Sequence, residues 1–136
     1  MEKAIYISGI GNLKYVTGEY SRLYFGHEFC QNLVPSREDA DSVLRFVSGK
    51  RMDFTLVTPF VTDKGMEQLK TVSAFILNRK PESEIVVNDW GALNWLSQEY
   101  PDAVLVLGRL LTKQKRGPRI LNLMGKVPDP MIAHFR

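Results

Sequence analysis

The chain alternates short apolar stretches with longer segments in which apolar residues recur every three or four positions. The short stretches are typical of β-strands, and the longer spacing is typical of amphipathic α-helices. Strands are predicted at residues 3–8, 22–25, 53–57, 84–87 and 103–107. Helices are predicted after the second, third and fourth strands, in residues 36–49, 62–80 and 89–100.

Polar capping residues, glycine and proline mark the ends of these predicted helices. Ser36 is a favoured N-cap residue, and Thr62 or Asp63 can cap the second helix. Gly49 is expected to stop the first helix, since glycine adopts the left-handed backbone of many helix C-termini. Pro81 is expected to end the second helix, because proline cannot continue a helical hydrogen-bond ladder.

Strand–helix–strand units in series favour a parallel sheet with right-handed crossovers. Two of the strands are continuous apolar runs, as in residues 103–107, which is typical of strands buried on both faces. We therefore predict an α/β fold: a parallel sheet of about five strands in βα repeats, resembling part of a TIM-like barrel. An open, doubly wound, flavodoxin-like sheet is the alternative. Residues 1–110 form this domain, and residues 111–136 form a basic C-terminal extension, considered as a sixth βα element.

Length and composition limit the class of protein. The chain has 136 residues, of which 44% are hydrophobic and 24% charged, as in ordinary globular domains. A complete eight-stranded barrel needs roughly 250 residues, so only part of one fits. No apolar run is long enough to span a membrane, and the N-terminal residues lack a signal-peptide core, so we expect a cytoplasmic protein. Cys30 alone cannot form an intramolecular disulfide or hold a metal, so we expect neither metal nor cofactor.

Positive charge is concentrated at the C-terminal end of the chain. Residues 1–108 contain 11 Lys and Arg against 14 Asp and Glu, whereas residues 109–136 contain seven against one. Such a segment suits nucleic acid or another polyanion, or it is simply a solvated end of the chain. The candidate polyanion-binding residues are Lys113, Lys115, Arg116 and Arg119.

Polar side chains and glycines follow the predicted strands, at the edge where parallel α/β proteins place their sites. Gly26, His27 and Glu28 follow the second strand, Asn88 and Asp89 the fourth, and Arg109 the fifth. The candidate catalytic residues are His27, Glu28 and Asp89, because imidazole and carboxylate groups transfer protons. The candidate ligand-binding residues are Gly26, Asn88 and Arg109, and Arg109 suits a carboxylate or phosphate.

Each of these candidates also has a structural interpretation. His27 and Glu28 can instead make polar contacts that hold a loop. Asn88 and Asp89 open a predicted helix, and both residue types are preferred N-caps, so the capping role is favoured over a pocket-facing carboxylate.

Three stretches resemble the collagenase-like peptidase family (peptidase family U thirty-two). They are Leu23-Tyr-Phe-Gly26, Ile85-Val-Val-Asn-Asp-Trp-Gly-Ala-Leu93 and Ala103-Val-Leu-Val-Leu-Gly-Arg109. The resemblance covers roughly residues 20–110 and implies a TIM-like barrel with Gly26, Asp89 and Gly91 at matching positions. Some members hold an iron–sulfur cluster through several cysteines, and of these Cys30 could supply only one.

Three functions are compatible with these features. The first is the N-terminal half of such a barrel, not expected to be catalytic alone, completed by self-association or by a second chain. The second is a binding module that uses the basic C-terminal segment for nucleic acid or an acidic partner. The third is a small enzyme with a strand-end pocket.

Overall fold

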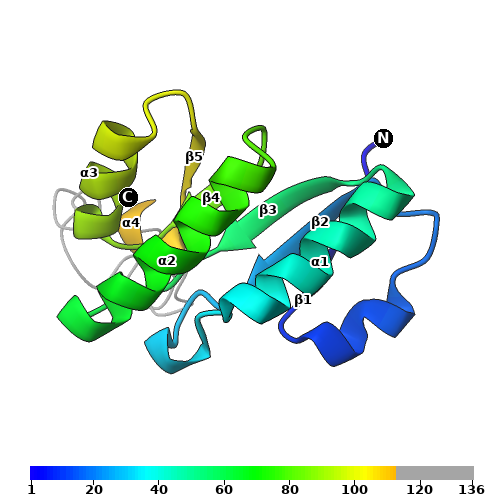
Figure 1. Ribbon diagram of the computed structural model, residues 1–136, viewed down its shortest axis with the longest axis horizontal. Coiled ribbons are helices and arrows are strands. Elements are labelled where there is room, and N and C mark those ends of the chain that lie inside the picture. The colour runs from blue at the N-terminus through cyan, green and yellow to red at the C-terminus, as the bar shows by residue number, and fades with distance from the viewer. Residues whose placement is uncertain (113–136) are drawn as a thin grey trace, which may run out of the picture.

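The computed structural model describes residues 1–112, which alternate strands and helices from end to end (Figure 1). The strands are β1 (Ala4–Ile7), β2 (Arg22–Gly26), β3 (Asp53–Val57), β4 (Glu84–Val87) and β5 (Val104–Leu107). The α-helices are α1 (Arg37–Lys50), α2 (Asp63–Arg79), α3 (Trp90–Glu99) and the short α4 (Arg109–Thr112). Two 3-10 helices precede them, η1 (Ile10–Tyr15) and η2 (Gln31–Leu33).

The five strands form one all-parallel sheet in the order β1-β2-β3-β4-β5, which confirms the predicted α/β class. A doubly wound sheet reverses its strand order at a switch point. This sheet has no reversal, so its order is that of consecutive strands in a barrel rather than that of a flavodoxin-like sheet.

One face of the sheet packs against the helices. Figure 1 shows α1 and α2 side by side in front of the strands, and the core joins residues of both helices to alternate strand residues. The sheet supplies Leu23, Phe25, Phe54, Leu56 and Ile85, each at most 1% exposed. No helix of the described residues lies over the opposite face, where Tyr6 is exposed. This open face is what positions the candidate site.

Two predicted helix caps are confirmed, and one predicted stop is wrong. The Ser36 hydroxyl accepts a hydrogen bond from the Asp39 backbone N–H, and the Asp89 carboxylate accepts one from Ala92. Helix α1, however, passes through Gly49 and ends at Lys50. Arg51 takes the left-handed position at a φ of 54°, which turns the chain so that the Met52 N–H bonds the Val47 carbonyl.

The prediction that continuous apolar strands are buried on both faces is wrong for β5. Val104, Val106 and Leu107 are 39–46% exposed. The reason is position in the sheet: β5 pairs with β4 alone among the described strands, so its other edge has no neighbour there. A continuous apolar run does not distinguish a central strand from an edge strand.

Within residues 1–112, no helix combines the length and the apolar character needed to cross a membrane. The predicted polyanion-binding residues and the proposed sixth βα element lie outside the described residues. They stay predictions.

Candidate functional site at the carboxyl ends of the strands

A cavity of about 600 Å³ lies on the open face, at the carboxyl ends of the strands. Tyr6 and Tyr24 are paired residues of β1 and β2, so they stand side by side on this face. Val57 and Val86 contribute apolar surface from the ends of β3 and β4. The full lining is Tyr6, Ser8, Tyr24, His27, Glu28, Phe29, Cys30, Val57, Val86 and Arg109.

Tyr6 is fixed by the end of the neighbouring strand. Its hydroxyl donates a hydrogen bond to the Gly26 carbonyl oxygen at 2.5 Å. Burial raises the pKa of the Tyr6 phenol, and the nearby Glu28 carboxylate raises it further, against the smaller opposing effect of Arg109. Tyr6 therefore remains a neutral hydrogen-bond donor, and its ring forms a wall of the cavity.

The backbone conformation at position 26 requires a glycine. Its φ is +128°, and a Cβ atom there would lie 2.2 Å from the Val57 carbonyl oxygen. The predicted ligand-binding role of Gly26 thus has a simpler basis. Gly26 lets β2 end close to β3 and turns the chain toward His27 and Glu28.

Glu28 and Arg109 form an ion pair across the mouth of the cavity, 81 residues apart in sequence. The Arg109 Nε and Nη2 atoms lie 2.9 and 2.5 Å from the Glu28 Oε2 atom. Burial pushes the pKa of the Glu28 carboxyl upward, but hydrogen bonds from Arg109 and Asn88 outweigh burial and hold it below its usual value. The Arg109 guanidinium also lies 5.0 Å from the centre of the Phe29 ring.

This pairing changes the expectation for Arg109. The sequence predicts that Arg109 binds a carboxylate or phosphate of a ligand, but the Glu28 carboxylate is its partner here. An anionic ligand that binds the same Nε and Nη2 edge of the guanidinium would therefore have to displace Glu28. As described, the pair adds no net charge to the cavity.

His27 lines the same cavity as Glu28, although the two residues are adjacent in sequence. Its side chain is half-buried. Among the described residues, no hydrogen bond or ion pair holds its imidazole ring. His27 is thus available to a ligand as a hydrogen-bond or proton-transfer group.

Asn88 and Asp89 have structural roles. The Asp89 oxygens accept hydrogen bonds from the backbone N–H groups of Ala92 and Val61, at 2.9 and 3.2 Å. Asn88 donates to the Thr58 carbonyl at 2.8 Å and accepts from the Leu110 N–H at 3.0 Å. Both side chains are at most 6% exposed and neither lines the cavity. The favoured capping interpretation is confirmed for Asp89, and its predicted catalytic role has no support from this geometry.

Asn88 also explains why residue 108 is a glycine. A Cβ atom on Gly108 would lie 2.1 Å from the Asn88 Oδ1 atom. The Asn88 side chain occupies the space beside Gly108, and its amide donates a hydrogen bond to the Glu28 Oε1 atom at 3.4 Å. This hydrogen bond helps to hold the Glu28 carboxylate in place for its ion pair with Arg109.

Several cavity residues were not among the predicted site residues, chiefly Tyr6, Tyr24 and Phe29. For the two tyrosines the signal is the alternation within the first two strands. Tyr6 and Tyr24 point to the face of the sheet away from the buried Ile7, Leu23 and Phe25. The sequence shows this alternation, but only the strand register places the two tyrosines together.

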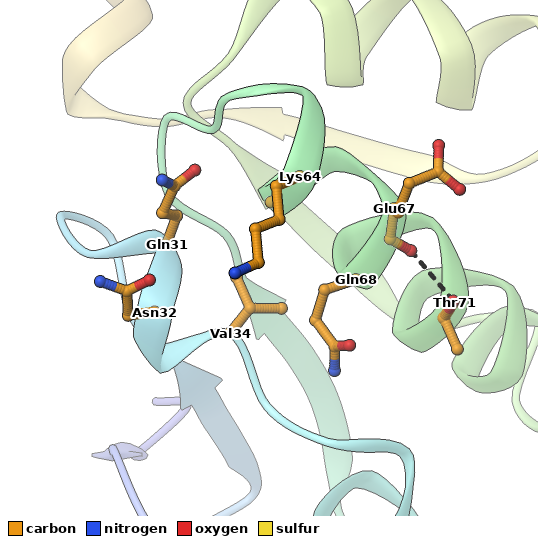
Figure 2. A pocket seen from close by; sticks show the side chains of 8 residues that line it. Gln31, Asn32, Val34, Lys64, Glu67, Gln68 and Thr71 are labelled. Carbon is orange, nitrogen blue, oxygen red and sulfur yellow. Dashed lines mark hydrogen bonds between the residues drawn. The ribbon is translucent and has the colours of Figure 1, made fainter.

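A second, polar groove of about 500 Å³ lies between η2 and the start of α2 (Figure 2). Figure 2 shows Gln31 and Asn32 on one side of it and Lys64 and Gln68 on the other. Gln31 uses its side-chain oxygen to accept bonds from the Thr62 N–H and hydroxyl at 2.7 and 3.0 Å. This groove is therefore the junction of two elements, and the strand-end cavity is the better candidate site.

The described residues contain no cluster of three or more His, Cys, Asp or Glu side chains that could hold a metal ion. Cys30 lines the cavity as a free thiol. Comparisons of the chain with protein-family models, with curated proteins and with solved structures found no match.

Proposed function

We propose that this chain is one part of a β/α barrel of the collagenase-like peptidase type and that it contributes one wall of a small-molecule site. The observation that carries the proposal is the cavity on the open face of a sequentially ordered parallel sheet. In closed barrels of this class, the inner face of the sheet is opposite the helices, and ligands bind at the carboxyl ends of the strands.

Five strands are too few to close such a barrel, which has eight. Further strands, from a second chain or from more of the same chain, would cover the open face and complete the site. We propose this assembly for a cytoplasmic protein, since one free cysteine suits a reducing compartment.

The polar groups of the cavity support binding better than complete catalysis. Arg109 neutralises Glu28, and the Asp89 carboxylate already accepts hydrogen bonds from the backbone N–H groups of Ala92 and Val61. His27 is then the one imidazole or carboxylate of the lining that no described ion pair holds. Acid–base catalysis usually needs a second positioned group, so we propose that this chain alone does not catalyse a reaction.

The test is an NMR titration of the isotope-labelled full chain with a set of small aromatic fragments. We expect binding to shift the signals of Tyr24, His27 and Arg109, and Tyr24→Ala to weaken it. Asn32→Ala, in the polar groove, is the matched control and should bind fragments like the wild type. Fragments that bind only elsewhere would refute the proposed site.

The catalytic part of the proposal has its own test. The chain is incubated with gelatin and with short peptides, and hydrolysis is followed by mass spectrometry. We expect no cleavage by the chain alone. Cleavage that His27→Ala abolishes, in a variant that still folds, would show that the chain is an enzyme by itself.

A further inference from the structure

The open face of the sheet carries two kinds of surface at its two ends. Toward the carboxyl ends of the strands it is aromatic and aliphatic, with Tyr6 and Val106 53% and 39% exposed. Strand register places Tyr6 beside Tyr24 and places Val86 beside Val106. This half resembles the apolar interior of a barrel rather than a solvated surface.

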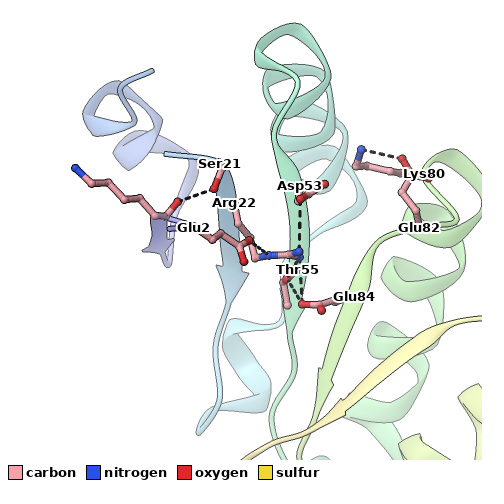
Figure 3. A network of polar contacts seen from close by, with 9 residues as sticks. Glu2, Ser21, Arg22, Asp53, Thr55, Lys80, Glu82 and Glu84 are labelled. Carbon is pink, nitrogen blue, oxygen red and sulfur yellow. Dashed lines mark hydrogen bonds and ion pairs between the residues drawn. The ribbon is translucent and has the colours of Figure 1, made fainter. Parts of the chain in front are cut away.

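Toward the amino ends of the strands the same face carries a charged cluster centred on Arg22 (Figure 3). The guanidinium lies 2.6 Å from a Glu2 carboxylate oxygen, 3.1 Å from one of Glu84 and 3.5 Å from one of Asp53. It also donates to the Thr55 hydroxyl, which in turn donates to Glu84 at 2.9 Å. Residues of three neighbouring strands thus meet at one side chain.

The charges of this Arg22 cluster do not balance. Three carboxylates surround one guanidinium, and Arg22 is the only cation of the described residues within 4.0 Å of any of them. The cluster therefore keeps two excess negative charges. The Arg22 side chain is only 16% exposed, whereas that of Asp53 is 63% exposed and faces outward. A molecule that covers the face must compensate this charge, because burying it without a counter-charge disfavours binding.

We propose that the open face docks a protein segment that is not a second copy of this chain, aliphatic opposite Tyr6 and Val106 and basic opposite Asp53 and Glu84. The inference rests on the proposed function, because it identifies the chemistry of the part that completes the barrel. Charge complementarity selects the partner: one or two Lys or Arg side chains would balance the Arg22 cluster.

The open face of a second copy does not supply that chemistry. When the open faces of two copies meet with their strands pointing the same way, the two Arg22 clusters lie opposite each other and repel. If they meet with strands reversed, each cluster is buried against the tyrosines and valines of the other copy. Both arrangements desolvate uncompensated charge.

The experiment uses a charge-reversed copy of the chain as the basic partner. Asp53→Lys with Glu84→Lys turns the Arg22 cluster from two excess negative charges to two excess positive charges. Sedimentation velocity measures association of the wild type, of the variant and of their mixture. We expect the mixture to associate at least about ten-fold more strongly than either chain alone, and less strongly at high salt.

The matched control is Glu67→Lys with Glu99→Lys, which makes the same change in net charge on exposed helical positions. Its mixture with the wild type should not associate more strongly than the wild type alone. Equal association in both mixtures would show a general effect of net charge and would overturn the inference.

Two further outcomes would also overturn it. Self-association of the wild type as strong as that of the mixture would make a second copy the occupant. Absence of association between two chains that NMR shows to be folded would mean that the face is already covered within one chain. Because the strand-end cavity lies on the same face, fragment binding is measured at chain concentrations too low for association, and it then tests the proposed function separately.

If the double lysine variant does not fold, Asp53→Asn with Glu84→Gln keeps the size of both side chains and one acceptor oxygen on each. This variant removes the excess negative charge. We then expect self-association about ten-fold stronger than that of the wild type, because the repulsion is gone. Equal self-association of the two proteins would refute the role of the charge.

Discussion

At the residue scale, Gly26 fixes how β2 ends and hence where the cavity begins. Its positive φ and its closeness to the Val57 carbonyl leave no room for a side chain. The same backbone presents a carbonyl oxygen to the Tyr6 hydroxyl. One residue without a side chain therefore connects β1, β2 and β3 at the edge that carries the site.

Gly26→Ala should lower the free energy of unfolding by roughly 1–3 kcal/mol, because the new Cβ atom forces both strain at φ and a backbone shift. The control is Gly49→Ala within α1, where no atom lies within 4 Å of the added Cβ. That change should raise the free energy of unfolding by roughly 0.5–1 kcal/mol. Urea denaturation measures both, and equal stability of the Gly26 variant and the wild type would contradict this account.

At the scale of elements, the junction of η2 and α2 depends on one side chain. Thr62 is the N-cap residue of α2, yet its own side chain makes no capping bond. The Gln31 side chain accepts the Thr62 N–H instead. Gly65, one turn into the helix, has no side chain that would clash with Gln31, since a Cβ there would lie 2.4 Å from its Oε1 atom.

Gln31→Ala should therefore act like the loss of a helix cap and lower the free energy of unfolding by roughly 0.5–2 kcal/mol. Hydrogen exchange should also become faster at the Thr62 amide, which loses its acceptor. The neighbouring Asn32 is exposed and serves as the control, since Asn32→Ala should change stability by no more than about 0.5 kcal/mol. An unchanged exchange rate at Thr62 would argue against the capping role.

At the scale of the whole molecule, the Glu28–Arg109 pair joins the segment after β2 to the start of α4 beyond the last strand. The pKa of the Glu28 carboxyl is lower in the folded protein than its ordinary value of 4.5. The folded state consequently binds fewer protons than the unfolded state near that pH. By linkage, the pair stabilises the fold at neutral pH and stops doing so as the pH falls below the folded pKa.

Replacement of the carboxylate should make this dependence visible. We expect Glu28→Gln to be less stable than the wild type near neutral pH, and the difference to shrink as the pH falls below 4.5, the ordinary pKa of the carboxyl. Thermal unfolding across a pH series measures the difference. Arg109→Gln should show the same trend because it removes the same pair. A difference that stays constant, or grows in acid, would exclude the pair as its source.

Much of the architecture follows from the sequence, because periodicity and capping are local properties. The βα repeats and the cap at Asp89 needed only neighbouring residues to be recognised. The local pattern could not predict how deeply β5 is buried, because an apolar run looks the same in the centre of a sheet and at its edge. The site shows the same division: His27 and Glu28 were identified as strand-end residues, whereas Tyr6 and Tyr24 were not.

The sequence by itself determined the βα repeats, the parallel sheet and the edge at which polar residues gather, since each depends on spacing along the chain. Only the tertiary structure decided that Arg109 is paired with Glu28, that Tyr6 stands beside Tyr24 and that three carboxylates meet at Arg22. These contacts join residues from separate strands and loops. Register and backbone conformation bring them together, and neither can be inferred from a local pattern of residue types.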